Sequence, residues 1–209
     1  MRRLITVWAC AAILFAWSTQ SQAGIIFDNS SRGDFQSNRG AGNSPIAAIT
    51  VSAATSINQI GAMLDPSSNG NLKFVIFDLG TSTLLFQAGP QAFVDTGLGF
   101  YLSAPFASFT LNPGITYGIG AVADVAAGWE INNTSSGNPF TQNNITASDD
   151  QNGNVVSFAS PSLGLPGTAM IIVELGSGAV VGVPEPASLA LLGGALLGFG
   201  IMLRRRNRV

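Results

Sequence analysis

The sequence predicts an all-β protein: an antiparallel β-sandwich of jelly-roll or Greek-key type, preceded by an N-terminal signal helix and followed by a C-terminal transmembrane helix. Three observations predict this organisation. In the middle of the chain, short apolar runs alternate with clusters of Gly, Pro, Asn and Asp, as in all-β domains. No long stretch there has the apolar period of roughly 3.6 residues that marks a helix. At each end, one longer apolar run lies beside arginines.

The N-terminal run has the layout of a secretory signal peptide. Arg2 and Arg3 precede an apolar stretch, and small residues stand at Ser21 and Ala23, three residues and one residue before a predicted cut. We therefore expect residues 1–23 to be removed by signal peptidase between Ala23 and Gly24. The single cysteine, Cys10, lies inside this peptide, so the mature chain has no thiol and no disulfide.

Residues 24–180 are the predicted sandwich domain. The segment 71–78 is apolar on both faces, which predicts a strand in the centre of its sheet. The Gly- and Asn-rich segments 30–43 and 135–154 are predicted as loops. The expected strands cover residues 46–52, 56–64, 71–78, 83–87, 91–94, 100–102, 107–111, 115–123, 128–131, 155–159 and 168–175.

A local motif supports the Greek-key connection. The sequence Leu111-Asn112-Pro113-Gly114-Ile115-Thr116-Tyr117 has the spacing of a tyrosine corner. In that motif the tyrosine hydroxyl hydrogen-bonds backbone a few residues upstream. We expect Tyr117 to have this structural role.

The third part, residues 181–209, has three features in sequence. Val183, Pro184, Glu185 and Pro186 form an extended segment, because proline fixes φ and lacks an amide hydrogen. The apolar run 187–203 is just long enough to approach a bilayer core of roughly 30 Å as a helix. The cationic end resists translocation and stays cytoplasmic, which leaves the body of the protein outside. This end carries Arg204, Arg205, Arg206 and Arg208.

These features together closely resemble the PEP-CTERM sorting signal. The resemblance implies recognition of Pro184-Glu185-Pro186 by an exosortase, a membrane-embedded cysteine transpeptidase, which cuts nearby and releases or transfers the body to the cell exterior. It also implies a bacterial protein, associated with exopolysaccharide and biofilm. The stretch from Asn71 through Asp124 resembles the sandwich domains common in such exported proteins. A permanent C-terminal anchor is the plainer alternative.

Charge and composition exclude several functions. Between residues 24 and 183 the chain has three basic against ten acidic side chains, a net charge of −7. Binding of nucleic acid or anionic lipid, which depends on Lys and Arg, is therefore not expected. Because the chain has no histidine and its mature part no cysteine, the Ser-His-Asp and Cys-His mechanisms and the usual zinc sites are excluded. We expect no enzymatic activity.

Three other possibilities stay open from the residues. A glycosidase would need two facing carboxylates, and candidates are Asp124, Glu130, Asp149 and Asp150, although solvated caps and loop positions are the favoured explanation of these residues. A carbohydrate-binding module would stack sugars on Trp129 and Tyr101, unless Trp129 is a core residue. No cofactor is expected, except that Asp28-Asn29-Ser30 and Asp149-Asp150-Gln151-Asn152 offer the oxygen ligands of a structural calcium ion.

We therefore expect an exported structural protein of the cell surface or extracellular matrix. It would be translocated through the Sec translocon, trimmed by signal peptidase and anchored transiently in the inner membrane by its C-terminal helix. An exosortase would then process it. Possible contact with extracellular polysaccharide completes the expected partners.

Overall fold

The computed structural model describes residues 24–132, 139–164 and 170–177, which belong to one unit spanning Ala23–Gly178. This part of the chain is almost entirely β-structure, with one short 3-10 helix, η1 (Ser30–Arg32). None of the described residues forms a helix that is long and apolar enough to cross a membrane. The predicted signal helix and transmembrane helix lie outside the described residues.

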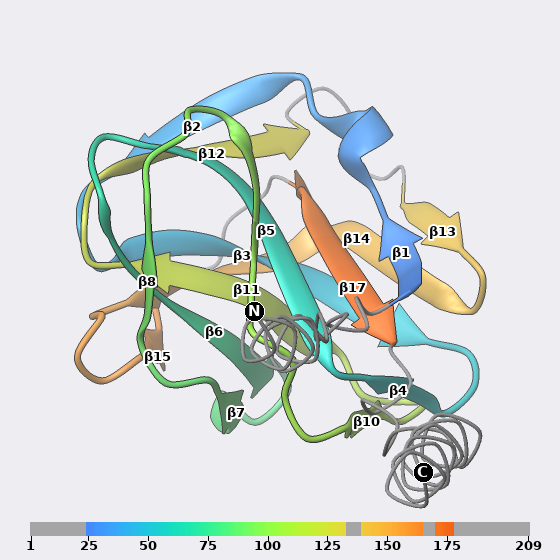
Figure 1. Ribbon diagram of the computed structural model, residues 1–209. Helices are drawn as coiled ribbons and strands as arrows, with labels where there is room; N and C mark the ends of the chain where they lie inside the picture. The colour runs from blue at the N-terminus through green and yellow to red at the C-terminus, as the bar shows by residue number, and fades with distance from the viewer. Residues whose placement is uncertain (1–23, 133–138, 165–169, 178–209) are drawn as a thin grey trace, which may run out of the picture. The chain divides into compact units, whose positions relative to one another are not determined.

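The first of two large sheets contains seven strands, all paired antiparallel. Along its main path the order is β1-β17-β5-β12-β16, with β2 paired to β12 and β9 paired to β5. Figure 1 shows β1, β17 and β5 side by side at the front of the molecule. The strands are β1 (Gly24–Asp28), β2 (Phe35–Arg39), β5 (Gln59–Pro66), β9 (Gly99–Leu102), β12 (Ala127–Asn132), β16 (Met170–Ile171) and β17 (Val173–Ser177).

The second sheet has eight strands, again antiparallel, in the order β13-β14-β3-β11-β6-β7, with β15 beside β14 and β8 beside β6. A separate two-stranded ladder joins β4 (Thr55–Ile57) to β10 (Phe109–Leu111). The strands of the second sheet are β3 (Asn43–Val51), β6 (Gly70–Asp78), β7 (Thr83–Gln87), β8 (Gln91–Phe93), β11 (Tyr117–Ala123), β13 (Phe140–Gln142), β14 (Ile145–Val156) and β15 (Ser162–Leu163).

The core lies between the two sheets. Trp129 and Leu175 from the first sheet share one buried cluster with Ile49, Phe74 and Tyr117 from the second. Strand β11 is buried along its whole length and lies between β3 and β6. The described residues are therefore mostly β, with packed antiparallel sheets, consistent with the predicted β-sandwich.

A smaller apolar cluster covers the outer face of the second sheet and includes Ile46 and Phe77. Gly118 allows close packing here: a Cβ at this position would lie 2.6 Å from Cδ1 of Ile46, so the end of the Ile46 side chain would have to move. Lys73 holds the loop that follows β14 against this cluster. Its ammonium donates to the carbonyl oxygens of Phe158 at 2.8 Å and Ala159 at 3.1 Å.

The sequence located most central strands but misplaced several boundaries. The expected strand 56–64 is divided at Asn58, whose amide donates to the carbonyl of Gly176, so that β4 and β5 join different ladders. The predicted loops 30–43 and 135–154 are wrong in part. They contain β2, the start of β3, β13 and most of β14, since polar edge strands and loops have similar compositions.

Candidate functional site

The two ends of the body lie next to each other in the first sheet. Gly24, the residue that follows the predicted signal-peptidase cut, pairs with Ser177, the last described residue of the C-terminal strand. Ala23 itself lies outside the described residues. The N-terminal strand β1 is therefore hydrogen-bonded along the strand that leads to the C-terminal segment.

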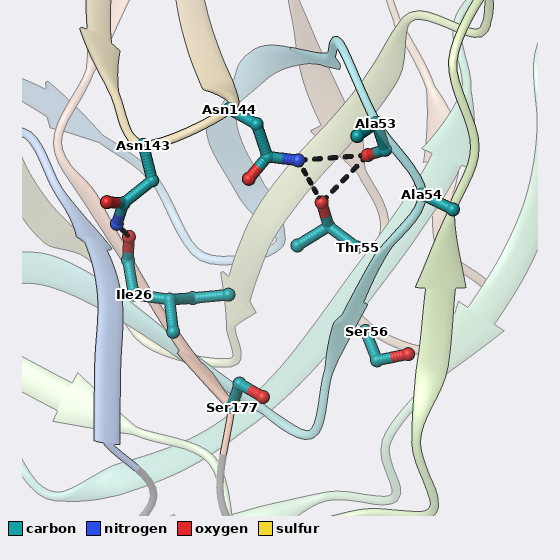
Figure 2. Close-up of a pocket in the computed structure, with 8 residues that line it drawn as sticks. All are labelled: Ile26, Ala53, Ala54, Thr55, Ser56, Asn143, Asn144 and Ser177. Atoms are coloured by element: carbon teal, nitrogen blue, oxygen red, sulfur yellow. Dashed lines mark hydrogen bonds between the residues drawn. The ribbon is translucent and has the colours of Figure 1, made fainter.

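A pocket of about 440 Å³ opens at this end of the sandwich. Figure 2 shows its walls, in which Nδ2 of Asn144 donates to the carbonyl of Ala53 at 2.9 Å and to the hydroxyl of Thr55. Nδ2 of Asn143 donates to the carbonyl of Ile26 at 2.6 Å. None of the lining residues is charged or has an acid–base group suited to catalysis. They are Ile26, Ala53, Ala54, Thr55, Ser56, Asn143, Asn144 and Ser177.

Amide side chains connect the two sheets at both open sides of the sandwich. On one side, Oε1 of Gln142 in the second sheet accepts from the amide of Asp28 in β1 at 2.7 Å. On the other, Gln91 of β8 donates to the carbonyl of Leu102 at 2.8 Å and accepts from the amide of Ala104 at 2.6 Å. A primary amide has a donor and an acceptor, so it can replace a missing strand partner. Apart from a high Asn and Gln content, no sequence pattern indicated these roles.

The two candidate sugar-binding aromatics are core residues. Trp129 is 1% exposed and Tyr101 is 9% exposed, so neither ring offers a free face on which a sugar could stack. For Trp129 the alternative interpretation, a tryptophan in the core, agrees with the structure. The alternative of a sugar contact through these two side chains is therefore not supported.

Tyr101 instead resembles Tyr117 in its hydrogen bonding. The hydroxyl of Tyr117 accepts the amide hydrogen of Asn112 at 2.8 Å, five residues upstream, as expected for a tyrosine corner. The hydroxyl of Tyr101 accepts the amide hydrogen of Thr96, also five residues upstream, at 3.0 Å. It also donates to the carbonyl of Gly97 at 3.1 Å.

The acidic candidates for catalysis have structural surroundings. The carboxylate of Asp124 accepts both the backbone amide and the side-chain amide of Asn71, each at 2.7 Å. Glu130 lies on β12, where burial, and secondly the charge of Asp34, raise the pKa of its carboxyl above the ordinary value. The side chains of Asp149 and Asp150 lie outside those that the structure describes.

The candidate calcium ligands near the N-terminus are partly occupied by the fold. Asn29 is fully buried; its Nδ2 donates to the carbonyl of Ile171 at 2.9 Å and its Oδ1 accepts from the amide of Val173 at 2.8 Å. Asp28 accepts the amide of Ser30 at 2.8 Å through Oδ1. Among the described residues, no three His, Cys, Asp or Glu side chains are grouped so that they could hold a metal ion.

The sorting residues themselves, Val183, Pro184, Glu185 and Pro186, lie outside the described residues, as do the four arginines from Arg204 to Arg208. Compared with known protein families, the chain matches the PEP-CTERM protein-sorting motif over residues 182–206. No curated protein and no solved structure matches it. The chain thus carries a PEP-CTERM sorting motif, which indicates an exosortase substrate that is exported and sorted to the cell surface.

Proposed function

Because the chain carries an exosortase sorting motif, we propose that it is a non-enzymatic structural protein of the cell surface or of an exopolysaccharide or biofilm matrix. The observation that carries this proposal is the match at residues 182–206. A sorting motif determines where a protein goes and not what it does there, so the role of the body depends on the residues of the body.

The proposed route has three steps. The Sec translocon exports the chain and signal peptidase cuts between Ala23 and Gly24. The apolar run 187–203 then holds the protein in the inner membrane, with the terminal arginines on the cytoplasmic side. Finally, exosortase recognises Pro184-Glu185-Pro186 and separates the body from its anchor.

The folded body is compatible with processing close to the membrane. Six residues separate Ser177, where β17 ends, from Pro184. A fully extended connection of this length spans at most roughly 25 Å. An enzyme that acts at Pro184 therefore works close to the end of the sandwich, where the lining of the pocket carries no charge.

A structural role for the body is supported by its chemistry. The mature chain has no histidine and no cysteine, and its net charge of −7 opposes binding to nucleic acid or anionic lipid. The two tyrosine hydroxyls and the bridging amides hold loops and sheet edges, as expected of a domain that must remain folded without disulfides. We also propose a jelly-roll or Greek-key topology for the sandwich, which the pairing of the first strand, β1, with the last, β17, supports.

The test locates the protein by fractionation after expression in an exosortase-containing host. Membrane, medium and matrix fractions are compared for wild type, for Glu185→Ala and for Glu130→Ala, which makes the same substitution outside the motif. We expect the body of wild type and Glu130→Ala in the matrix and Glu185→Ala in the membrane. Removing the protein should also weaken the matrix under shear. A body found only in the medium, with an unchanged matrix on its removal, would overturn the structural role.

A further inference from the structure

Strand β7 (Thr83–Gln87) is an outer strand of the second sheet: within the described residues it pairs with β6 on one side and with no strand on the other. Figure 1 shows it next to β6 at the lower left. The amide of Ala88, just after the strand, donates to the carbonyl of Phe74 at 2.9 Å. Backbone groups alternate in direction along an antiparallel ladder, so the N–H and C=O of Gln87 point away from β6. Gln87 is exposed, and no described residue binds these two groups.

Two outer strands of the first sheet are protected in a way that β7 is not. On β1, the carbonyl of Ile26 accepts a hydrogen bond from Nδ2 of Asn143. On β9, the carbonyl of Leu102 accepts one from Nε2 of Gln91. These amide side chains occupy backbone groups that an incoming strand would need. Among the described residues, none caps the open side of β7 in this manner.

The side chains of β7 favour pairing with another chain. Its sequence, Thr-Leu-Leu-Phe-Gln, combines residues of high β-propensity with the absence of charge and proline. A bulge leaves Leu85 unpaired between Leu84 and Phe86, and the two leucines are 37% and 42% exposed. Natural edge strands are commonly protected by charge, by proline or by a bulge, and β7 has the bulge alone.

A second copy of the same strand is the partner that suits this edge. Unpaired N–H and C=O groups in a row are satisfied by an extended backbone, so the partner must present a strand. Residues 79–94 contain no charged side chain, and two copies can therefore meet here without bringing like charges together. The net charge of −7 over residues 24–183 opposes association elsewhere. A two-fold axis also brings the exposed leucines of both copies onto one face, where they shield each other from water.

We propose that β7 pairs antiparallel with β7 of a second copy, so that two bodies share one continuous sheet. The contact uses the same edge on both copies, so it closes as a dimer and does not grow into a fibre. The dimer goes beyond the matrix role proposed above and does not depend on it. Its test uses purified protein, so a negative result would leave the fractionation test unaffected.

The test measures the protein mass of the purified full chain in density-matched detergent by sedimentation equilibrium across a concentration series. The mass of wild type should double as one copy becomes two. Leu85→Lys should stay at one copy, because it brings two cations together at the joined edge. This substitution makes the acidic body less negative, so a change in general charge repulsion would have the opposite effect.

Gln87→Pro tests the backbone itself. Proline removes the N–H that points away from β6, so it should abolish the dimer and leave the urea unfolding midpoint nearly unchanged. Val94→Lys is the matched control for Leu85→Lys, because Val94 is 67% exposed, lies just after β8 and receives the same charge. This variant should dimerise like wild type.

Two results would overturn the pairing of β7 strands. One is a wild type that stays at one copy at every concentration. The other is a pattern that does not depend on β7: either β7 variant dimerises like wild type, as it would if the apolar run 187–203 held the copies together, or Val94→Lys loses the dimer as well.

Discussion

The hydroxyls of Tyr101 and Tyr117 offer a paired test of the loop connections. Replacing either residue with phenylalanine removes one oxygen and keeps the buried ring. At Tyr117 the change removes the acceptor of one amide hydrogen bond of 2.8 Å. Since a typical hydrogen bond contributes about 1 kcal/mol net, we expect a loss of about that size.

The hydroxyl of Tyr101 makes more hydrogen-bonding contacts than that of Tyr117. It accepts from the amide of Thr96, donates to the carbonyl of Gly97, and lies 3.2 Å from the hydroxyl of Thr96. Losing these contacts should cost roughly 2–3 kcal/mol, about two to three times the loss at Tyr117. Urea unfolding of both variants gives the comparison, with the midpoint lowered and the m-value unchanged. The reasoning fails if Tyr101→Phe costs no more than Tyr117→Phe.

Two further predictions concern the sheet edges and the pH dependence of stability. Gln91→Ala removes one hydrogen bond to Leu102 of β9 and one to Ala104 just after that strand, and should cost roughly 1–3 kcal/mol in urea unfolding. Alanine at the exposed Gln87 should cost little, and equal losses would contradict the bridging role. The pKa of Glu130 is raised in the folded protein by burial and by Asp34, so the native state binds this proton more tightly than the unfolded state. Stability should therefore fall as the pH rises from the unfolded-state pKa near 4.5 through the raised folded-state pKa. Glu130→Gln should flatten the plot of the urea unfolding midpoint against pH over this range. An unchanged slope in the variant would show that the carboxyl is not perturbed.

The sequence was most informative where local pattern and tertiary environment agree. The strand expected at residues 71–78 is β6, Gly70–Asp78. A segment that is apolar on both faces must be buried on both faces, which favours a position in the middle of its sheet. The hydrogen bond of Tyr117 followed from a spacing within seven residues. Both are short-range signals.

It was least informative where long-range partners decide the outcome. Strand β2 has the sequence Phe-Gln-Ser-Asn-Arg, which resembles a loop, yet it pairs with β12 about ninety positions later in the chain. The burial of Trp129 and Tyr101 likewise depends on packing between sheets. The pairing of Asp28 with Glu174 joins the two ends of the domain, and nothing local in the sequence indicates it.

The most direct measurement of the central claim is the mass of the C-terminus after expression in a host with an exosortase. Wild type, Glu185→Ala and Glu130→Ala are purified and the C-terminal peptides are identified by mass spectrometry. An exosortase substrate should lose the segment that ends in Arg204 to Val209 in wild type and in Glu130→Ala, and keep it in Glu185→Ala. An intact C-terminus in all three would contradict processing and indicate a permanently anchored protein.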